Sequence, residues 1–192
     1  RDWSSDVCSS DLPAFAADKA TVSFTYVAAW PSSNITTHIA ARIIQEKLGY
    51  GTHLTSTDAG PMWAAVASGR ADAMLTAWLP TTHKVYWDKY QKDVIDLGAI
   101  TDGPWLGLAV PKYVPIDPIA ELEAHHTKFK NRITGIEAGA GIMINTQKAI
   151  KAYDLKDMEL LTSSTAAMQA QLKRAVDRKD WIVVTAWKPL GI

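Results

Sequence analysis

Two tryptophans occupy equivalent places in a repeated motif. Residues 76–80 read Thr-Ala-Trp-Leu-Pro and residues 185–189 read Thr-Ala-Trp-Lys-Pro, which puts Trp78 and Trp187 at matching positions. The face of an indole ring is electron-rich, and a cation held against it contributes about 0.5–2 kcal/mol. Because an alkylated ammonium group needs no hydrogen-bond acceptor, it is the cation that suits this face best. Strand tryptophans more often pack in the core, but the repeated position favours a binding role.

A candidate anion site lies just before the first expected helix. Residues 30–36 read Trp-Pro-Ser-Ser-Asn-Ile-Thr. Serine and asparagine are typical first-turn capping residues, and the unpaired backbone N–H groups of such a turn bind anions. Capping and anion binding are compatible, so this turn can receive the carboxylate of a zwitterionic ligand. Trp30 directly precedes the turn and is a further candidate, for the floor of the cation site.

Two other segments are less specific. His83 follows two threonines, and it either hydrogen-bonds a ligand or the residues that support one, or it is a capping or a surface histidine. Residues 139–141 read Gly-Ala-Gly between an expected strand and helix, but Ile144 stands where a dinucleotide-binding fingerprint has its third glycine. We interpret this loop as a helix cap or as part of the wall of a ligand cleft.

Two units with the same order of elements position these residues. In the first unit we expect strands over residues 22–27, 53–57 and 72–80, and helices over residues 33–48 and 61–68. In the second unit we expect strands over residues 132–136, 159–164 and 180–189, and helices over residues 141–153 and 165–176. This alternation predicts an α/β protein of two lobes, each a mostly parallel sheet flanked by helices. Ligands bind beyond the carboxyl ends of parallel strands, so one tryptophan of each lobe should face an inter-lobe cleft.

The two units are connected by a short apolar strand bracketed by glycine and proline. It covers residues 105–111, and we interpret it as the crossover and hinge. Residues 17–104 then form lobe 1, and residues 112–192 form lobe 2. Each lobe has enough apolar residues for a core of its own, since hydrophobic residues make up 47% of the chain.

The first residues differ in character from the rest of the chain. Residues 1–12 are polar and without periodicity, and they include the one cysteine, Cys8. Residues 13–16 read Pro-Ala-Phe-Ala, as at the end of a secretory signal peptide. We therefore expect residues 1–16 to be a non-native leader with a signal-peptide remnant, and the mature protein to be periplasmic.

Composition and motifs argue against several classes of protein. Lys and Arg number 20, as do Asp and Glu, so the formal charge is zero and nothing favours binding to nucleic acid. The apolar stretches are shorter than the roughly 20 residues of a transmembrane helix. The chain carries no HExxH, CxxC, GxSxG or P-loop motif, so we expect no catalysis, no metal and no cofactor.

Over residues 21–189 the chain resembles the glycine betaine substrate-binding proteins of ABC importers. The motifs that carry the resemblance are Tyr26-Val27 with Trp30, Ala77-Trp78-Leu79-Pro80 with Thr82-His83, Val110-Pro111-Lys112-Tyr113-Val114, Gly135-Ile136-Glu137 with Gly139-Ala140-Gly141-Ile142, and Trp181-Ile182-Val183-Val184-Thr185 with Trp187-Lys188-Pro189. The resemblance implies a type II periplasmic-binding-protein fold that closes on a trimethylammonium group. Trp78 and Trp187 would cage that group, and the backbone amides of Ser33 and Asn34 would hold a carboxylate.

The same resemblance implies the binding partners, and the sequence departs from the family in two respects. The partners would be a small betaine and the permease subunits of an ABC transporter, and the protein would be a monomer. Ser33 and Asn34 stand where the family usually carries glycine and an aliphatic residue, which makes the pocket more polar. The chain also ends at Ile192, where the family continues with a return segment and another cage tryptophan, so we expect a truncated sequence.

Three questions stay open at this point. A Rossmann-like enzyme that binds a nucleotide at the loop of residues 139–141 is the alternative from another functional class. A ligand-sensing domain of a receptor is a third reading. Within the transport reading, the ligand can be glycine betaine, proline betaine, carnitine, choline or a sulfonium analogue.

Overall fold

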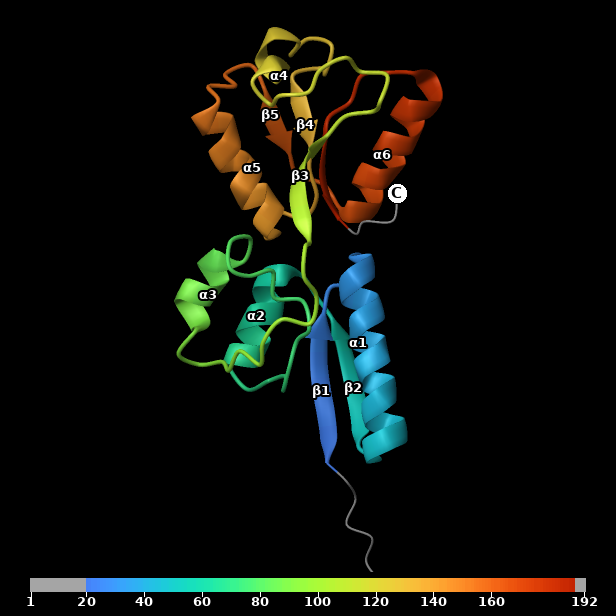
Figure 1. Cartoon of the computed structure of the whole chain (residues 1–192), viewed down its shortest axis with the longest axis vertical. Coiled ribbons are helices and arrows are strands. Elements are labelled where there is room, and N and C mark those ends of the chain that lie inside the picture. The colour runs from blue at the N-terminus through green and yellow to red at the C-terminus, as the bar shows by residue number, and fades with distance from the viewer. Residues whose placement is uncertain (1–19, 189–192) are drawn as a thin grey trace, which may run out of the picture.

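The computed structural model describes residues 20–188, so the expectations for the leader and for Pro189 lie outside the described residues. Two lobes stand end to end, with the helices of each lobe beside its strands (Figure 1). Within residues 20–188 no helix combines the length and the apolar character that crossing a bilayer requires.

Lobe 1 is built on two parallel strands, β1 (Thr21–Tyr26) and β2 (Gly51–Ser56), which pair over their whole length. Buried small residues at helical spacing, Ser33, Thr37 and Ala41, form the inward face of the first helix. The helices of this lobe are α1 (Pro31–Ile43), which continues into the π-helical turn η1 (Ile44–Leu48), α2 (Ala59–Ala67) and α3 (Lys84–Tyr90).

The strand expected over residues 72–80 is present only as a single bridge, and that prediction is wrong beyond its second residue. Ala73 bridges to Phe24, and Asp72 is held beside β1 by hydrogen bonds from Ser23 of 2.6 and 2.7 Å. Beyond the bridge the chain leaves β1, because the side chain of Thr76 bonds to Ser33 of α1 at 2.9 Å. Trp78 therefore lies on an irregular segment rather than at a strand end.

Lobe 2 contains a four-stranded sheet with the order β3-β6-β4-β5. The neighbours β4 and β5 are parallel, as are β4 and β6, whereas β3 is an antiparallel edge strand paired to β6. The strands are β3 (Trp105–Ala109), β4 (Arg132–Thr134), β5 (Glu159–Leu161) and β6 (Val184–Lys188), and the helices are α4 (Glu121–Ala124), α5 (Gly141–Ala152) and α6 (Thr165–Arg178). The expected strand within residues 105–111 is thus confirmed, and it belongs to the sheet of lobe 2. Its role as a hinge stays a prediction.

The larger of two buried clusters crosses the boundary between the lobes. It joins Trp30 and Trp63 of lobe 1 to Ile136, Met168 and Trp187 of lobe 2, all of them 7% exposed or less. A second cluster, around Phe129, Ile133 and Val183, lies wholly within lobe 2. Lobe 1 thus shares its apolar core with the facing end of lobe 2.

Candidate ligand site between the lobes

A small cavity lies where the two lobes meet, and we call it the inter-lobe cavity. Its volume is about 30 Å³, which is room for one or two water molecules. No carboxylate lines it, so any cation there would be held by aromatic faces rather than by an ion pair. The lining residues are Trp30, Trp78, Thr82, His83, Leu106, Ile136, Ala140, Gly141, Ile142 and Trp187.

The structure brings the three predicted tryptophans together at this cavity. Trp187 lies on β6, is 7% exposed, and meets Trp30 edge to face with ring centroids 6.3 Å apart. Trp30 directly precedes α1, and its buried indole N–H has no partner among the described residues. Trp78 is partly buried and packs against the same cluster. Lobe 1 therefore supplies two indoles and lobe 2 supplies the third.

His83 lies deep in the site and not on the surface. Its Nδ1 accepts hydrogen bonds from the indole N–H of Trp63 at 3.2 Å and from the backbone N–H of Trp78 at 3.1 Å. Burial lowers the pKa of His83 to about 4, so the ring is neutral at pH 7 and its proton is on Nε2. The ring thus fixes the backbone of Trp78, which makes His83 a positioning residue for the tryptophan.

We expect the stability of the protein to fall in acid because of His83. Between about pH 6.5 and pH 4, His83 is protonated in the unfolded chain but stays neutral in the folded protein. The free energy of unfolding should therefore be greatest above pH 6.5 and fall by about 3 kcal/mol as the pH drops to 4. Urea unfolding at pH 7, 5.5 and 4 measures this dependence.

The variant His83→Gln is the control for that experiment. Glutamine retains an acceptor oxygen but does not titrate in this range. We expect the variant to be less stable at pH 7 and to lose less stability than the parent between pH 7 and pH 4. Identical pH dependence of the two proteins would show that other groups cause the acid sensitivity.

In the first turn of α1, one of the two backbone amides of the predicted anion site is already hydrogen-bonded. The backbone N–H of Asn34 donates to the carbonyl of Trp30 at 2.9 Å, so it is not available to a ligand in this structure. The backbone N–H of Ser33 has no partner among the described residues. Its hydroxyl is in use, because it accepts from the N–H of Val27 at 3.0 Å. Neither residue lines the inter-lobe cavity, although α1 begins at the lobe boundary (Figure 1).

The loop of residues 139–141 lies against lobe 1, as the interpretation of a cleft wall predicted. The hydroxyl of Tyr86 on α3 donates to the carbonyl of Gly139 across the boundary at 2.6 Å. A Cβ atom on Gly141 would lie 2.4 Å from the carbonyl oxygen of Thr82, so only glycine allows the lobes to approach this closely. Sequence reasoning missed Tyr86 and Thr82, although a glycine at a helix start is a signal of close backbone approach.

Glu137, which begins this loop, caps a helix. Its carboxylate accepts from the backbone N–H of Thr165 at 2.8 Å and from the hydroxyl of Thr165 at 2.9 Å. A carboxylate at a helix start is also favoured by the helix dipole. The loop is thereby tied to the start of α6.

Replacing Tyr86 with phenylalanine should weaken the contact between the lobes without disturbing either lobe. The variant loses one hydrogen bond, which is worth about 0.5–1.5 kcal/mol. We expect ligand affinity to fall roughly 2- to 10-fold, measured by isothermal titration calorimetry. Tyr90→Phe is the matched control, because Tyr90 lies one turn along the same helix and its hydroxyl donates no hydrogen bond within residues 20–188. An equal fall in both variants would contradict a role for the cross-lobe bond.

Comparison with known families excludes one of the open readings. Residues 20–192 match the family described as the substrate binding domain of ABC-type glycine betaine transport systems. The chain belongs to this family. The family is one of substrate-binding proteins and not of enzymes, so the Rossmann-like enzyme is no longer a competing reading. The resemblance seen in the sequence is confirmed.

Three glycine betaine-binding relatives support the assignment. The chain is 39% identical over 103 residues to the glycine betaine/carnitine transport binding protein GbuC of Listeria monocytogenes, covering 53% of this chain and 34% of the relative. The crystal structure of the glycine betaine/L-proline-binding protein ProX of Borrelia burgdorferi has 38% identity and a TM-score of 0.84, covering 88% of this chain and 63% of the other. Lactococcal OpuAC in its closed conformation with glycine betaine has 38% identity and a TM-score of 0.81, covering 90% and 66%.

These similarities confirm the predicted α/β binding-protein fold. They also show that the chain spans between about a third and two thirds of the length of each relative.

Proposed function

We propose that the protein captures glycine betaine or a related quaternary ammonium compound for import by an ABC transporter. The observation that carries this proposal is the inter-lobe cavity, where indoles from both lobes gather without a carboxylate. Such a site attracts a cation through ring faces, and it selects alkylated ammonium because it offers few hydrogen-bond acceptors. Family membership and the glycine betaine named for the three relatives support the same ligand class.

Binding requires the lobes to separate and close again. Pockets for organic ligands commonly measure about 300–1000 Å³, whereas the inter-lobe cavity measures about 30 Å³. The edge-to-face contact between Trp30 and Trp187 has to open so that the trimethylammonium group can enter between the indoles. Closure is favoured when the ligand contacts both lobes at once, because contacts made only in the closed state shift the equilibrium toward it.

The carboxylate of a betaine is assigned to the start of α1. The N–H of Ser33 has no partner within residues 20–188, and the positive end of the helix dipole lies at the same place. Trp30 directly precedes this turn and lines the inter-lobe cavity, so the two halves of a zwitterion would meet adjacent parts of the chain. Asn34 would contribute its backbone amide only if the first turn of α1 rearranges on binding.

Titration with three ligands tests the proposed function. Glycine betaine should produce a saturable change in tryptophan fluorescence, because the ligand changes the surroundings of three indoles. Choline has the same cation but no carboxylate, so it should bind more weakly if the start of α1 contributes. Glycine, which lacks the methyl groups, should not bind. A folded protein that binds none of the three, or that binds glycine equally well, would contradict the proposal.

Import also requires a partner and a location outside the cytoplasm. We propose that the two lobes, once closed on the ligand, dock as a monomer on the permease subunits of the transporter, and that the protein works in the periplasm. Co-purification with the transporter in the presence of glycine betaine, compared with its absence, would test the interaction. A permease complex that forms equally in both conditions would contradict a role for the closed state.

A further inference from the structure

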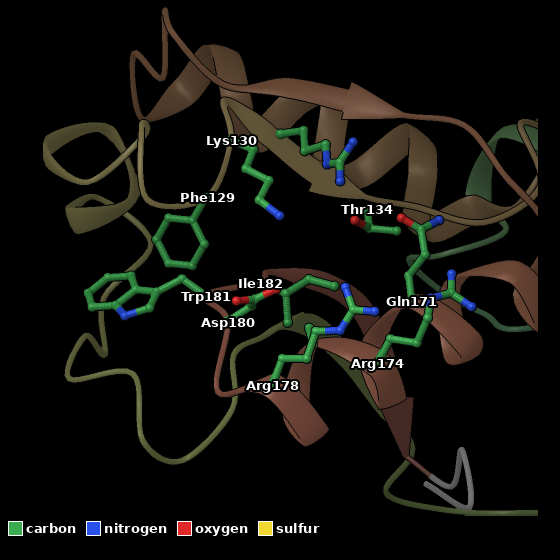
Figure 2. Close-up of a pocket in the computed structure, with 11 residues that line it drawn as sticks. Phe129, Lys130, Thr134, Gln171, Arg174, Arg178, Asp180, Trp181 and Ile182 are labelled. Atoms are coloured by element: carbon green, nitrogen blue, oxygen red, sulfur yellow. The ribbon is translucent and has the colours of Figure 1, made fainter.

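A second and larger cavity lies within lobe 2, away from the inter-lobe cavity, and we call it the basic pocket. Its volume is about 190 Å³. Figure 2 shows Lys130 and Arg178 pointing toward each other across it, from the chain before β4 and from α6. Its lining residues are Phe129, Lys130, Arg132, Thr134, Gln171, Arg174, Ala175, Arg178, Asp180, Trp181 and Ile182. No residue of the inter-lobe cavity is shared with it.

The basic pocket lies between β4 and the segment that leads into β6. β4 and β6 pair only where Thr134 lies opposite Val184, so residues 180–182, which precede β6, run apart from Arg132 at the start of β4. The hydroxyl of Tyr113 fixes this divergence, because its one proton is shared between the backbone carbonyl oxygen of Asp180 at 2.7 Å and that of Ala175 at 3.2 Å. The walls are therefore held in place by the fold.

The charges on the lining are strongly unbalanced. Lys130, Arg132, Arg174 and Arg178 are cationic, whereas Asp180 is the one acidic residue, which leaves three net positive charges. None of these four cationic side chains forms an ion pair or a hydrogen bond within the described residues. The nearest acid on α6, Asp177, is paired with Lys173 at 3.5 Å and does not neutralise them.

The two arginines of α6 bring like charges together on the wall of the basic pocket. Arg174 and Arg178 are four residues apart, so they lie on one face of the helix, where like charges are destabilising. Gln171 is one turn earlier on that face and adds an amide donor. Arginine also offers a planar fork of donors that matches the oxygens of phosphate. A bound anion would remove the repulsion and use the donors.

We propose that the basic pocket binds a phosphate group that carries an ionisable proton, either inorganic phosphate or a phosphate monoester. Four cations suit a dianion, and the volume accommodates a small anion rather than a large organic ligand. Asp180 distinguishes phosphate from other dianions. A carboxylate repels sulfate, which has no proton at neutral pH, but it accepts a hydrogen bond from a protonated phosphate oxygen.

Calorimetric titration of the protein with inorganic phosphate and with sulfate at low ionic strength tests this assignment. Phosphate should bind saturably and at least tenfold more tightly than sulfate. Because the cations are exposed, the affinity should fall as sodium chloride is raised from 20 to about 150 mM. No binding of phosphate, or equal binding of the two anions, would overturn the proposal. Titration with glycerol phosphate distinguishes inorganic phosphate from a phosphate monoester. A site that accepts only inorganic phosphate should not bind glycerol phosphate, whereas a site for monoesters should.

Two variants separate the roles of the lining residues. The double variant Arg174→Gln/Arg178→Gln should bind phosphate at least tenfold more weakly. Its thermal unfolding midpoint should be unchanged or raised, because both side chains are exposed and repel each other. Asp180→Asn should reduce the preference for phosphate over sulfate at least threefold. Unaltered phosphate affinity in the arginine variant, or an unaltered preference in the asparagine variant, would contradict the assignment. Titration with glycine betaine is a separate readout, because its site lies between the lobes.

Discussion

Replacing Trp187 with alanine should reduce the affinity for glycine betaine roughly 10- to 100-fold. The indole is the one contribution of lobe 2 to the three tryptophans of the inter-lobe cavity. Its removal takes away a cation–π contact, which is worth about 2 kcal/mol or more where the cation is desolvated. Since every 1.4 kcal/mol changes a dissociation constant tenfold, this loss falls in that range. Calorimetry or fluorescence titration with glycine betaine measures it.

Two further variants keep that result interpretable. Trp187 is buried, and truncating a buried tryptophan to alanine costs about 3–5 kcal/mol of stability, so thermal unfolding has to be recorded beside binding. Trp78→Ala tests the same cavity at a partly buried position, where the loss of stability should be smaller. Trp105→Ala is the matched control, because this tryptophan of β3 is 53% exposed and does not line the cavity.

The interpretation depends on which variants lose affinity for glycine betaine. A loss in Trp187→Ala and Trp78→Ala, with Trp105→Ala unchanged within about twofold, would support a cavity that needs indoles from both lobes. Retained affinity in either cavity variant, in a protein that remains folded, would contradict the proposed cation site.

Much of the site could be predicted because its residues are marked by local sequence. The repeated Thr-Ala-Trp-x-Pro motif placed Trp78 and Trp187 at corresponding positions, and both line one cavity in the structure. The strand and helix order of the second unit was also readable, because β4, α5, β5, α6 and β6 each follow a local pattern of apolar spacing and turn residues.

The rest depended on contacts between distant parts of the chain. The segment after Ala73 has an apolar pattern typical of a strand, yet it leaves β1 because Thr76 bonds to Ser33. Likewise, a histidine after two threonines looks like a surface cap. His83 is instead buried, since Trp63 and the backbone of Trp78 both donate to it. Neither partner is identifiable without the tertiary structure, which overrides local preference.

Replacing Gly141 with alanine should prevent the lobes from closing fully and so reduce the affinity for glycine betaine at least tenfold. The added Cβ atom would lie 2.4 Å from the carbonyl oxygen of Thr82, a backbone atom that cannot rotate away. The lobes would have to move apart, which would lengthen the hydrogen bond from Tyr86 to Gly139 and separate Trp187 from the tryptophans of lobe 1. A loss of about 1.4 kcal/mol in closed-state contacts corresponds to the tenfold change.

Gly139→Ala is the matched control two residues earlier in the same loop. Its Cβ atom would lie 3.5 Å from the hydroxyl oxygen of Tyr86, which is an ordinary contact, so the affinity should change less than about twofold. Small-angle scattering with saturating glycine betaine should give a larger radius of gyration for Gly141→Ala than for Gly139→Ala. If Gly141→Ala binds and compacts like the parent, the approach of Thr82 to Gly141 is not part of the ligand-bound state. If it binds weakly and remains open, the glycine at the start of α5 is what lets the two lobes meet around a ligand.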